Sequence, residues 1–549
     1  MTPGNQSNQA APPPRNQIHF ARGEVHLFIK HRPHMSAGEI IDRIKSSGVL
    51  TRPLSKHVRP NDPQGPGQGG EQVQIYYSTD RVWTFDPSVF EGGQNDQQAY
   101  SLVFVDIPAL GDEQRLLQYL RDVYDEVAQA PKSDEFTIDQ ATPNWLSAGS
   151  PEPDGSGGPG GKPVAPGPGV VIADATKILE LPFDLGITTP LDQRGACAEV
   201  FILDTAPCEV DLGRAYQKWV DEPLKRGEQP HAILQRLLGP NGALRDASGN
   251  LRIEYGGHSH LLEVADAFLP DHDYVMADHG LFVAGIINTF APAARLHLLE
   301  VLSPYGMGTL ENIVAGFLRA AEFASEHPGA KVVVNASLFL GVGQKDAESR
   351  AVLIERDLFW ANIPPQLFDG DFAPLASVCA FIDKYAARIV AASGNDGTKR
   401  RNQENQQLED FHPSARYPAA YDPVLGVAAL GFDDQMALYS NKPDVPEAAG
   451  AAAFGGTGTG GVTDPNLGMI GVYIGSYPDG IPNTLGLASW SGTSFATPVI
   501  SAALSALLCE KDPEKAISEI KAKFANPPIE GEGSASAPTG PGSSHATAA

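Results

Sequence analysis

A serine stands at the start of the most apolar stretch of this sequence. Ser494 lies in residues 491–496 (SGTSFA), and residues 495–509 are apolar on every side. Such a run predicts a helix buried in a sizeable domain. The free N–H groups and the positive dipole end of that helix favour negative charge beside Ser494, as the oxyanion of an acyl transfer requires. The alternative is a serine that only caps the helix.

Acyl transfer by a serine also needs a base, an acid that orients the base, and an oxyanion donor. His279 precedes apolar residues at helical spacing, which places an imidazole at a helix start. Asp204 ends a buried strand predicted over residues 199–204, and open α/β sheets bind ligands at the carboxyl ends of their strands. Asn395 follows a second predicted strand, residues 388–392, and offers an amide donor. Taken singly, Asp204 also fits a helix cap or turn, His279 a core histidine and Asn395 a turn. The catalytic interpretation therefore depends on their occurring together.

The order Asp204, His279, Asn395, Ser494 resembles the subtilisin-like serine proteases. The likeness spans roughly residues 170–509 and continues between these four residues, at 291–296, 301–302, 306–310, 333–338, 417–419 and 424–429. It implies a doubly wound α/β domain, a mostly parallel sheet with helices on both faces. It also implies a serine endopeptidase in which Ser494 attacks the peptide carbonyl, His279 moves the proton and Asp204 orients His279. Asn395 would share the oxyanion hole with the backbone N–H of Ser494.

In this family the substrate backbone binds as an extra strand between two protein segments. The matching residues here are Gly306, Met307, Gly308, Ser337, Leu338 and Phe339. The chain departs from the family pattern where Leu281 and Phe282 replace a Thr and a His after the catalytic histidine, and where Phe339 replaces a Gly. A large side chain at position 339 either narrows the substrate pocket or points away, and both alternatives stay open. Substrate preference is therefore less predictable than catalysis.

The Gly- and Pro-rich run at residues 151–169 predicts a flexible linker. We assign residues 1–17 to a disordered N-terminus, 18–148 to an N-terminal α+β domain, 149–169 to the linker, 170–526 to the catalytic domain and 527–549 to a disordered tail. The N-terminal domain reads as strand 25–29, a helix from the capping box Ser36–Glu39 to Gly48, strands 73–77 and 101–107, and a helix over 116–127. A ferredoxin-like domain fits this order. The family resemblance suggests a pro-domain removed by self-cleavage in the linker; a permanent regulatory domain is the alternative.

The net charge of −26, from 40 basic and 66 acidic residues, argues against a nucleic-acid partner. No apolar run approaches the ~20 residues of a membrane span, and the N-terminus lacks a secretory signal pattern. The scattered cysteines, Cys197, Cys208, Cys379 and Cys509, are interpreted as buried or free thiols. These features predict a cytoplasmic protein with no membrane contact.

No cofactor is expected. The resemblance also allows calcium, but no readable calcium-loop pattern is present and no metal site is assigned. His258, His260, His272 and Asp273 are interpreted as an ordinary polar loop. The expected partners are a protein or peptide substrate and the chain's own N-terminal domain or linker.

Three alternatives to hydrolysis by a serine protease stay open. The same acyl-enzyme could pass to an amine, which would make the protein a peptide ligase or macrocyclase. A catalytically inactive scaffold would use the fold only to bind proteins. The carboxyl-type serine peptidases use a Glu and an Asp in place of His279 and Asn395, so the residues present here disfavour that class.

Overall fold

The computed structural model describes residues 20–57, 74–90, 98–130, 132–149, 161–167, 185–256, 275–340, 373–401, 407–443, 450–459 and 462–524. The two chain ends that we expected to be disordered lie outside the described residues, and so do the histidines of the loop before His279.

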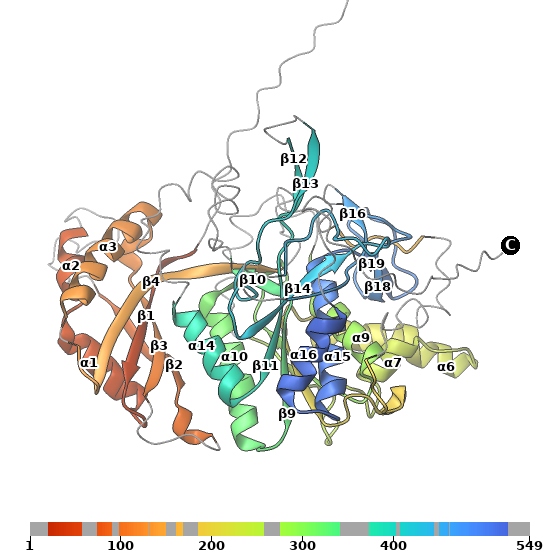
Figure 1. The fold of residues 1–549 in the computed structure, drawn as a ribbon, viewed down its shortest axis with the longest axis horizontal. Helices are drawn as coiled ribbons and strands as arrows, with labels where there is room; N and C mark the ends of the chain where they lie inside the picture. The colour runs from red at the N-terminus through yellow and green to blue at the C-terminus, as the bar shows by residue number, and fades with distance from the viewer. Residues whose placement is uncertain are drawn as a thin grey trace, which may run out of the picture.

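A seven-stranded parallel sheet forms the centre of the larger domain (Figure 1). Its order is β15-β14-β11-β9-β5-β7-β6, and every neighbouring pair is parallel. The strands are β5 (Ala198–Asp204), β6 (Ile253–Glu254), β7 (Arg295–Glu300), β9 (Lys331–Ala336), β11 (Arg388–Ala392), β14 (Val424–Leu430) and β15 (Ala451–Phe454). The predicted parallel α/β sheet is confirmed.

Helices cover both faces of this sheet because its strands are apolar on both sides. Along β5, Val200 and Ile202 join a core with α9 (His279–Phe290) and α15 (Thr493–Leu508). Phe201 and Leu203 point the other way and join a second core with α10 (Leu310–Glu326) and α14 (Ala373–Tyr385). The alternation of side chains along one strand therefore supplies both hydrophobic layers.

Shorter elements surround the sheet. The helices are α5 (Glu209–Tyr216), α6 (Glu222–Arg226), α7 (Ala232–Leu238) and α16 (Pro513–Lys523). Three antiparallel hairpins follow in the chain: β12 (Thr398–Arg401) with β13 (Leu408–Phe411), β16 (Gly458–Thr459) with β17 (Val462–Thr463), and β18 (Met469–Val472) with β19 (Leu487–Trp490). Among the described residues no helix has the length and apolar character needed to span a bilayer.

The N-terminal domain is an antiparallel sheet of order β4-β1-β3-β2 with helices packed on it. Its elements are β1 (Phe20–His31), α1 (Ala37–Ser47), α2 (Thr51–His57), β2 (Tyr76–Phe85), β3 (Ala99–Asp106), α3 (Glu113–Gln129) and β4 (Phe136–Gly149). The capping box is confirmed: Ser36 N donates to Glu39 Oε2 at 2.9 Å, and Glu39 N donates to Ser36 Oγ at 3.3 Å.

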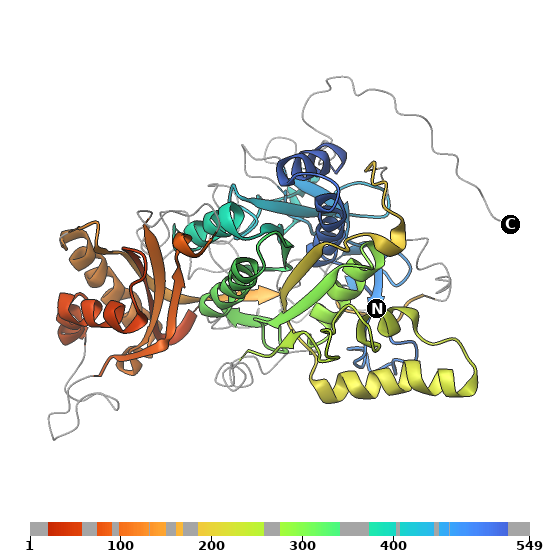
Figure 2. The ribbon, with the colours of Figure 1, turned by 90° about the horizontal axis from the view of Figure 1, so that it is seen from below.

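Two strands of this domain differ from the sequence prediction. The strand predicted over 73–77 begins at Tyr76 and continues to Phe85. The strand β4 was not predicted at all, although its middle pairs with β1 over most of that strand. It extends out of the N-terminal sheet towards β10 of the larger domain, as Figures 1 and 2 show.

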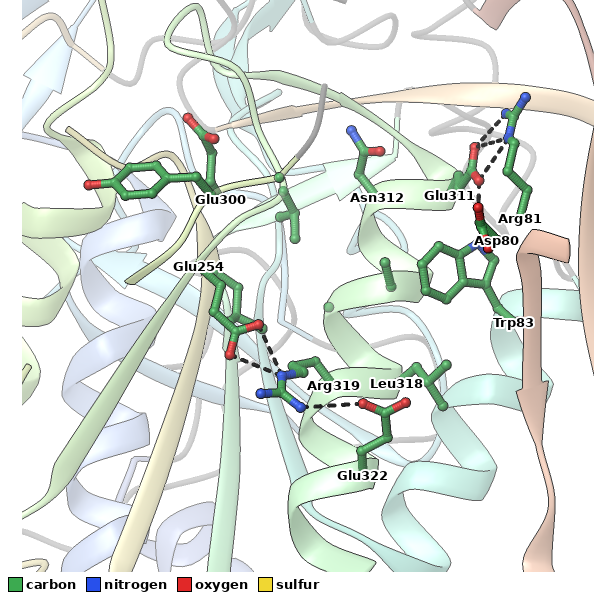
Figure 3. A pocket seen from close by; sticks show the side chains of 16 residues that line it. Asp80, Arg81, Trp83, Glu254, Glu300, Glu311, Asn312, Leu318, Arg319 and Glu322 are labelled. Atoms are coloured by element: carbon green, nitrogen blue, oxygen red, sulfur yellow. Dashed lines mark hydrogen bonds and ion pairs between the residues drawn. The ribbon is translucent and has the colours of Figure 1, made fainter. Parts of the chain in front are cut away.

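The N-terminal sheet packs against α10 and α14. Phe85 meets Phe381 of α14 edge to face at 5.4 Å, and the Tyr100 hydroxyl donates to Ser377 O at 2.5 Å. Arg81 of β2 reaches Glu311 of α10, with Nε 3.0 Å from Oε1 (Figure 3). Arg81 also pairs with Glu24 of its own domain at 2.7 Å. Apolar, hydrogen-bonded and ionic contacts therefore all join the two parts.

Candidate active site

The side chains of Asp204 and His279 meet at the carboxyl end of the central strand. Asp204 is the last residue of β5 and His279 the first of α9. His279 Nδ1 lies 2.7 Å from Asp204 Oδ1, and neither side chain has exposed surface. The Thr205 N–H also donates to Asp204 Oδ1 at 2.7 Å, which fixes the carboxylate. A carboxylate held on Nδ1 leaves Nε2 as the nitrogen for proton transfer.

Gly280 permits this approach of α9 to β5. A Cβ at position 280 would lie 2.2 Å from Thr205 O and 2.9 Å from the Asp204 Cβ. The Gly280 N–H instead lies 3.3 Å from Thr205 Oγ1. The glycine after His279 is therefore required by close backbone contact.

Ser494 lies in the first turn of α15 and is fully buried. Its Oγ donates to Ser337 O at 3.2 Å, and Ser337 Oγ donates to Ser494 O at 2.9 Å. Phe495 contacts the His279 ring, with a centroid separation of 5.2 Å. The helix start thus lies between the histidine and the segment that begins with Ser337.

Asn395 presents an amide N–H group without a partner beside this helix start. Its Oδ1 accepts from both the backbone N–H and the hydroxyl of Thr493, each at 3.0 Å. Its Nδ2 is buried and has no hydrogen-bond partner, and the whole residue is 4% exposed. A buried donor left unpaired costs stability, so an acceptor that binds beside Asn395 Nδ2 would be favoured. The arrangement can stabilise an oxyanion on a carbonyl at Ser494.

The structure shows how Phe282, which stands where the family has a second histidine, is packed. Phe282 packs against Phe495 at 4.6 Å and against Trp490 at 5.6 Å, and Trp490 meets the His279 ring edge to face at 5.3 Å. These rings form an aromatic cluster behind the imidazole. Sequence reasoning missed Trp490 and Thr493, although both lie within a few residues of Ser494.

Asp278, the residue before His279, positions the start of α9. Its carboxylate is 5% exposed and accepts from the N–H groups of Ile474 and Gly475 at 2.8 and 2.5 Å. Burial raises its pKa to about 6. The link holds the segment after β18 against the helix start. Nothing in the sequence signalled this role.

The residues predicted to clamp a substrate hold the end of β4 instead. Leu146, Ser147 and Ala148 pair antiparallel with β8 (Met307–Thr309), and residues 147–149 pair antiparallel with β10 (Leu338–Leu340). Gly306 has a φ of +76° and turns the chain into β8. The chain's own N-terminal domain therefore occupies the position expected of an extra strand.

A second segment of the chain lies against the residues that precede Ser494. Residues 161–167, inside the run expected to be a flexible linker, are bound along β19. Val164 exchanges backbone hydrogen bonds with Ser489 at 3.0 and 2.9 Å, and Gly161 O accepts from Trp490 Nε1 at 2.6 Å. A Cβ on Gly161 would lie 2.1 Å from Thr463 N. The expected flexibility does not extend to this segment.

The interpretation of all four cysteines as thiols is wrong for two of them. Cys197 and Cys509 form a disulfide across 312 residues of sequence, whereas Cys208 and Cys379 are free. Cys197 precedes β5 and Cys509 follows α15. Because α15 starts at the carboxyl edge of the sheet and runs back to its amino edge, the two ends meet there. Sequence spacing contains no sign of that geometry.

A pocket of about 560 Å³ lies between β2, α10 and the ends of β6 and β7 (Figure 3). Carboxylates dominate its charged lining, and burial raises the pKa of one of them, Glu300, to about 7. None of the predicted catalytic or substrate-binding residues lines it. Among the described residues, no group of three or more His, Cys, Asp or Glu side chains is arranged to hold a metal ion.

Comparisons with known proteins relate part of this chain to a protein family. Residues 270–527, which include His279, Asn395 and Ser494, match the model of the subtilase family. The minor extracellular protease Epr of Bacillus subtilis (strain 168) is 25% identical over 247 residues, 43% of this chain and 27% of that protein. The chain therefore matches about a quarter of the length of this curated relative.

A solved structure, the crystal structure of a lanthipeptide protease, is 17% identical with a TM-score of 0.35 and covers 65% of this chain and 90% of that one. The family assignment rests on the sequence match and on the parallel sheet with its helices. Residues 270–527 of this chain belong to the subtilase family.

Proposed function

We propose that this protein is a serine endopeptidase with Ser494 as nucleophile. The observation that carries the proposal is the contact of 2.7 Å between His279 Nδ1 and Asp204 Oδ1, together with the unpartnered amide of Asn395 beside Ser494. A base oriented by a carboxylate and a free oxyanion donor are what acyl transfer by a serine requires.

In the proposed reaction Ser494 Oγ forms a bond to the peptide carbonyl carbon, and His279 takes the hydroxyl proton. The carbonyl oxygen becomes an oxyanion, to which Asn395 Nδ2 and the Ser494 N–H donate. The C–N bond then breaks, and the leaving amine takes the proton from His279. Water repeats the sequence on the acyl-enzyme and releases the acid.

We further propose that the N-terminal domain inhibits the site until the chain is cut between Gly149 and Gly161. The last residues of β4 fill the clamp formed by β8 and β10, and Ser494, His279 and Asp204 have no exposed surface. Both observations describe a covered site. Pairing through main-chain hydrogen bonds also suits an inhibitory strand, because a substrate would need the same partners.

Mass spectrometry of the full-length chain and of its Ser494→Ala variant tests both proposals. The active protein is expected to yield two fragments separated between residues 149 and 161, and the variant to stay at full length. A fluorophosphonate should label Ser494 in the active protein only. Identical masses for the two proteins would count against self-cleavage, and absence of labelling against the nucleophile. Ligated instead of hydrolysed peptide products would point to the ligase alternative.

A further inference from the structure

The position of the catalytic groups determines where one substrate side chain must go; this step rests on the proposed function. The reacting carbonyl has to lie between Ser494 Oγ and Asn395 Nδ2, on a strand held by β10. The side chain of the residue before the scissile bond then enters the space between β10 and the loop of residues 393–396. What fills that space decides which residue is accepted.

The backbone of residues 416–417 closes one side of this space. Leu340 N, at the end of β10, donates to Tyr417 O at 2.9 Å, and Arg416 N donates to Ser393 O at 2.8 Å. Residues 416–417 therefore lie between β10 and the chain that leaves β11. They form the floor beneath the substrate side chain.

Two side chains fill the space above that floor. Phe339 and Arg416 are only 2% and 3% exposed. The Arg416 guanidinium stacks over the Phe339 ring, with Cζ 4.3 Å from the ring centroid, so the pair spans from β10 to the loop. A Cβ on Gly394 would lie 3.3 Å from Arg416 Cγ, which shows how closely the arginine stem runs beneath the loop.

A buried ion pair holds Arg416 in this position. Its guanidinium binds the Asp396 carboxylate with two bonds, one from Nε to Oδ2 at 2.6 Å and one from Nη2 to Oδ1. Asn441 Nδ2 donates to Asp396 Oδ2 at 2.9 Å, and Asp396 N donates to Asn441 Oδ1 at 2.7 Å. Asp396 neutralises the charge of Arg416. Phe339 and Arg416 therefore affect a substrate by the space that their side chains occupy, not by charge. Moving either side chain would break this buried ion pair, which is costly.

We propose that Phe339 and Arg416 together close the pocket for the side chain that precedes the scissile bond. The enzyme then cleaves after Gly, Ala or Ser and excludes large apolar and aromatic residues. Phe339 is the residue that determines this specificity. Of the two alternatives that the sequence left open at position 339, the proposal selects the one in which the side chain narrows the substrate pocket.

A peptide series that differs only in the residue before the scissile bond tests the proposal. The protein is first cut between residues 149 and 161, by itself or by an added protease that is then removed. A fluorophosphonate counts active Ser494 in one sample, and kcat/KM is measured in another for Gly, Ala, Ser, Leu and Phe peptides. The small residues are expected to exceed Leu and Phe by about 100-fold. In Phe339→Ala the ratio of kcat/KM for the Phe peptide to that for the Ala peptide should rise tenfold or more.

This ratio does not depend on the fraction of variant that folds, since both peptides meet the same active enzyme. Phe432→Ala removes a ring that is 69% exposed and should leave the ratio unchanged. Equal cleavage after Ala and Phe by the unmodified enzyme, or an unchanged ratio in Phe339→Ala, would overturn the assignment. Absence of both labelling and hydrolysis would overturn the protease function itself.

Discussion

At the scale of single residues, the site combines polar atoms that are firmly held with others that lack a hydrogen-bond partner. Asp204 Oδ1 is fixed by Thr205 and His279, and Asn395 Oδ1 is fixed by Thr493. Asp204 Oδ2 and the Asn395 amide nitrogen are buried without a partner, and of these two atoms the amide nitrogen is the donor. A donor fixed in place before the substrate binds needs no reorganisation when negative charge develops, which is the basis of electrostatic catalysis.

Replacing Asn395 with Leu should lower kcat by roughly 10²–10³, the size expected when one oxyanion donor is removed. KM should change little, because the donor acts mainly in the transition state. Thr493→Val keeps Asn395 but removes one of the two bonds that orient it, so a smaller loss in kcat is expected. Steady-state kinetics with an Ala peptide would check both. An equal effect of the two variants would argue that Asn395 only supports the loop.

At the scale of elements, the proposed catalysis depends on the contact between α9 and β5. The helix carries His279 and the strand carries Asp204, and the two approach so closely that position 280 has no space for a side chain. The apolar periodicity predicted both elements. Their separation was not predictable, because it depends on backbone contacts between segments distant in sequence.

The variant Gly280→Ala tests this contact. A methyl group 2.2 Å from Thr205 O must push α9 away from β5. We expect a stability loss of about 1–3 kcal/mol from overpacking and a fall in kcat of at least about tenfold, since His279 moves with the helix. Urea denaturation in the Ser494→Ala background and kinetics in the active protein measure the two effects. Gly213→Ala is the matched control, because Gly213 lies in α5 with nothing within 4 Å of its added Cβ.

At the scale of the whole molecule, the N-terminal domain and the catalytic domain are joined in two ways. The end of β4 lies in the clamp, and the N-terminal sheet packs on α10 and α14. The Cys197–Cys509 disulfide joins the two elements that carry Asp204 and Ser494. Disulfides persist mainly in oxidising compartments, so this pairing removes the cysteine pattern as a ground for the predicted cytoplasmic location. The location of the protein stays a prediction.

Removing the ion pair between Arg81 and Glu311 should weaken the hold of the N-terminal domain. Both side chains are largely buried, at 20% and 13% exposed, so Arg81→Met leaves a poorly solvated carboxylate on α10. On the proposed inhibition, activity against an Ala peptide should then appear with a lag that is shorter by about tenfold, equivalent to ~1.4 kcal/mol of lost docking energy. Arg43→Met removes an ion pair inside the N-terminal domain, with Glu135, and should not change the lag. A lag unaffected by Arg81→Met would contradict this role of the interface.

The sequence by itself determined what local patterns encode. The apolar runs predicted strands and buried helices, and the capping box predicted α1. The order of Asp204, His279, Asn395 and Ser494 indicated the subtilase family and, through that resemblance, the parallel sheet. Only the tertiary structure decided that Asn395 keeps a free amide, that β4 fills the clamp, that Cys197 pairs with Cys509, and that Phe339 lies under Arg416. Each of these facts is a contact between segments far apart in the chain. Such contacts depend on how layers pack, and local periodicity carries no information about them.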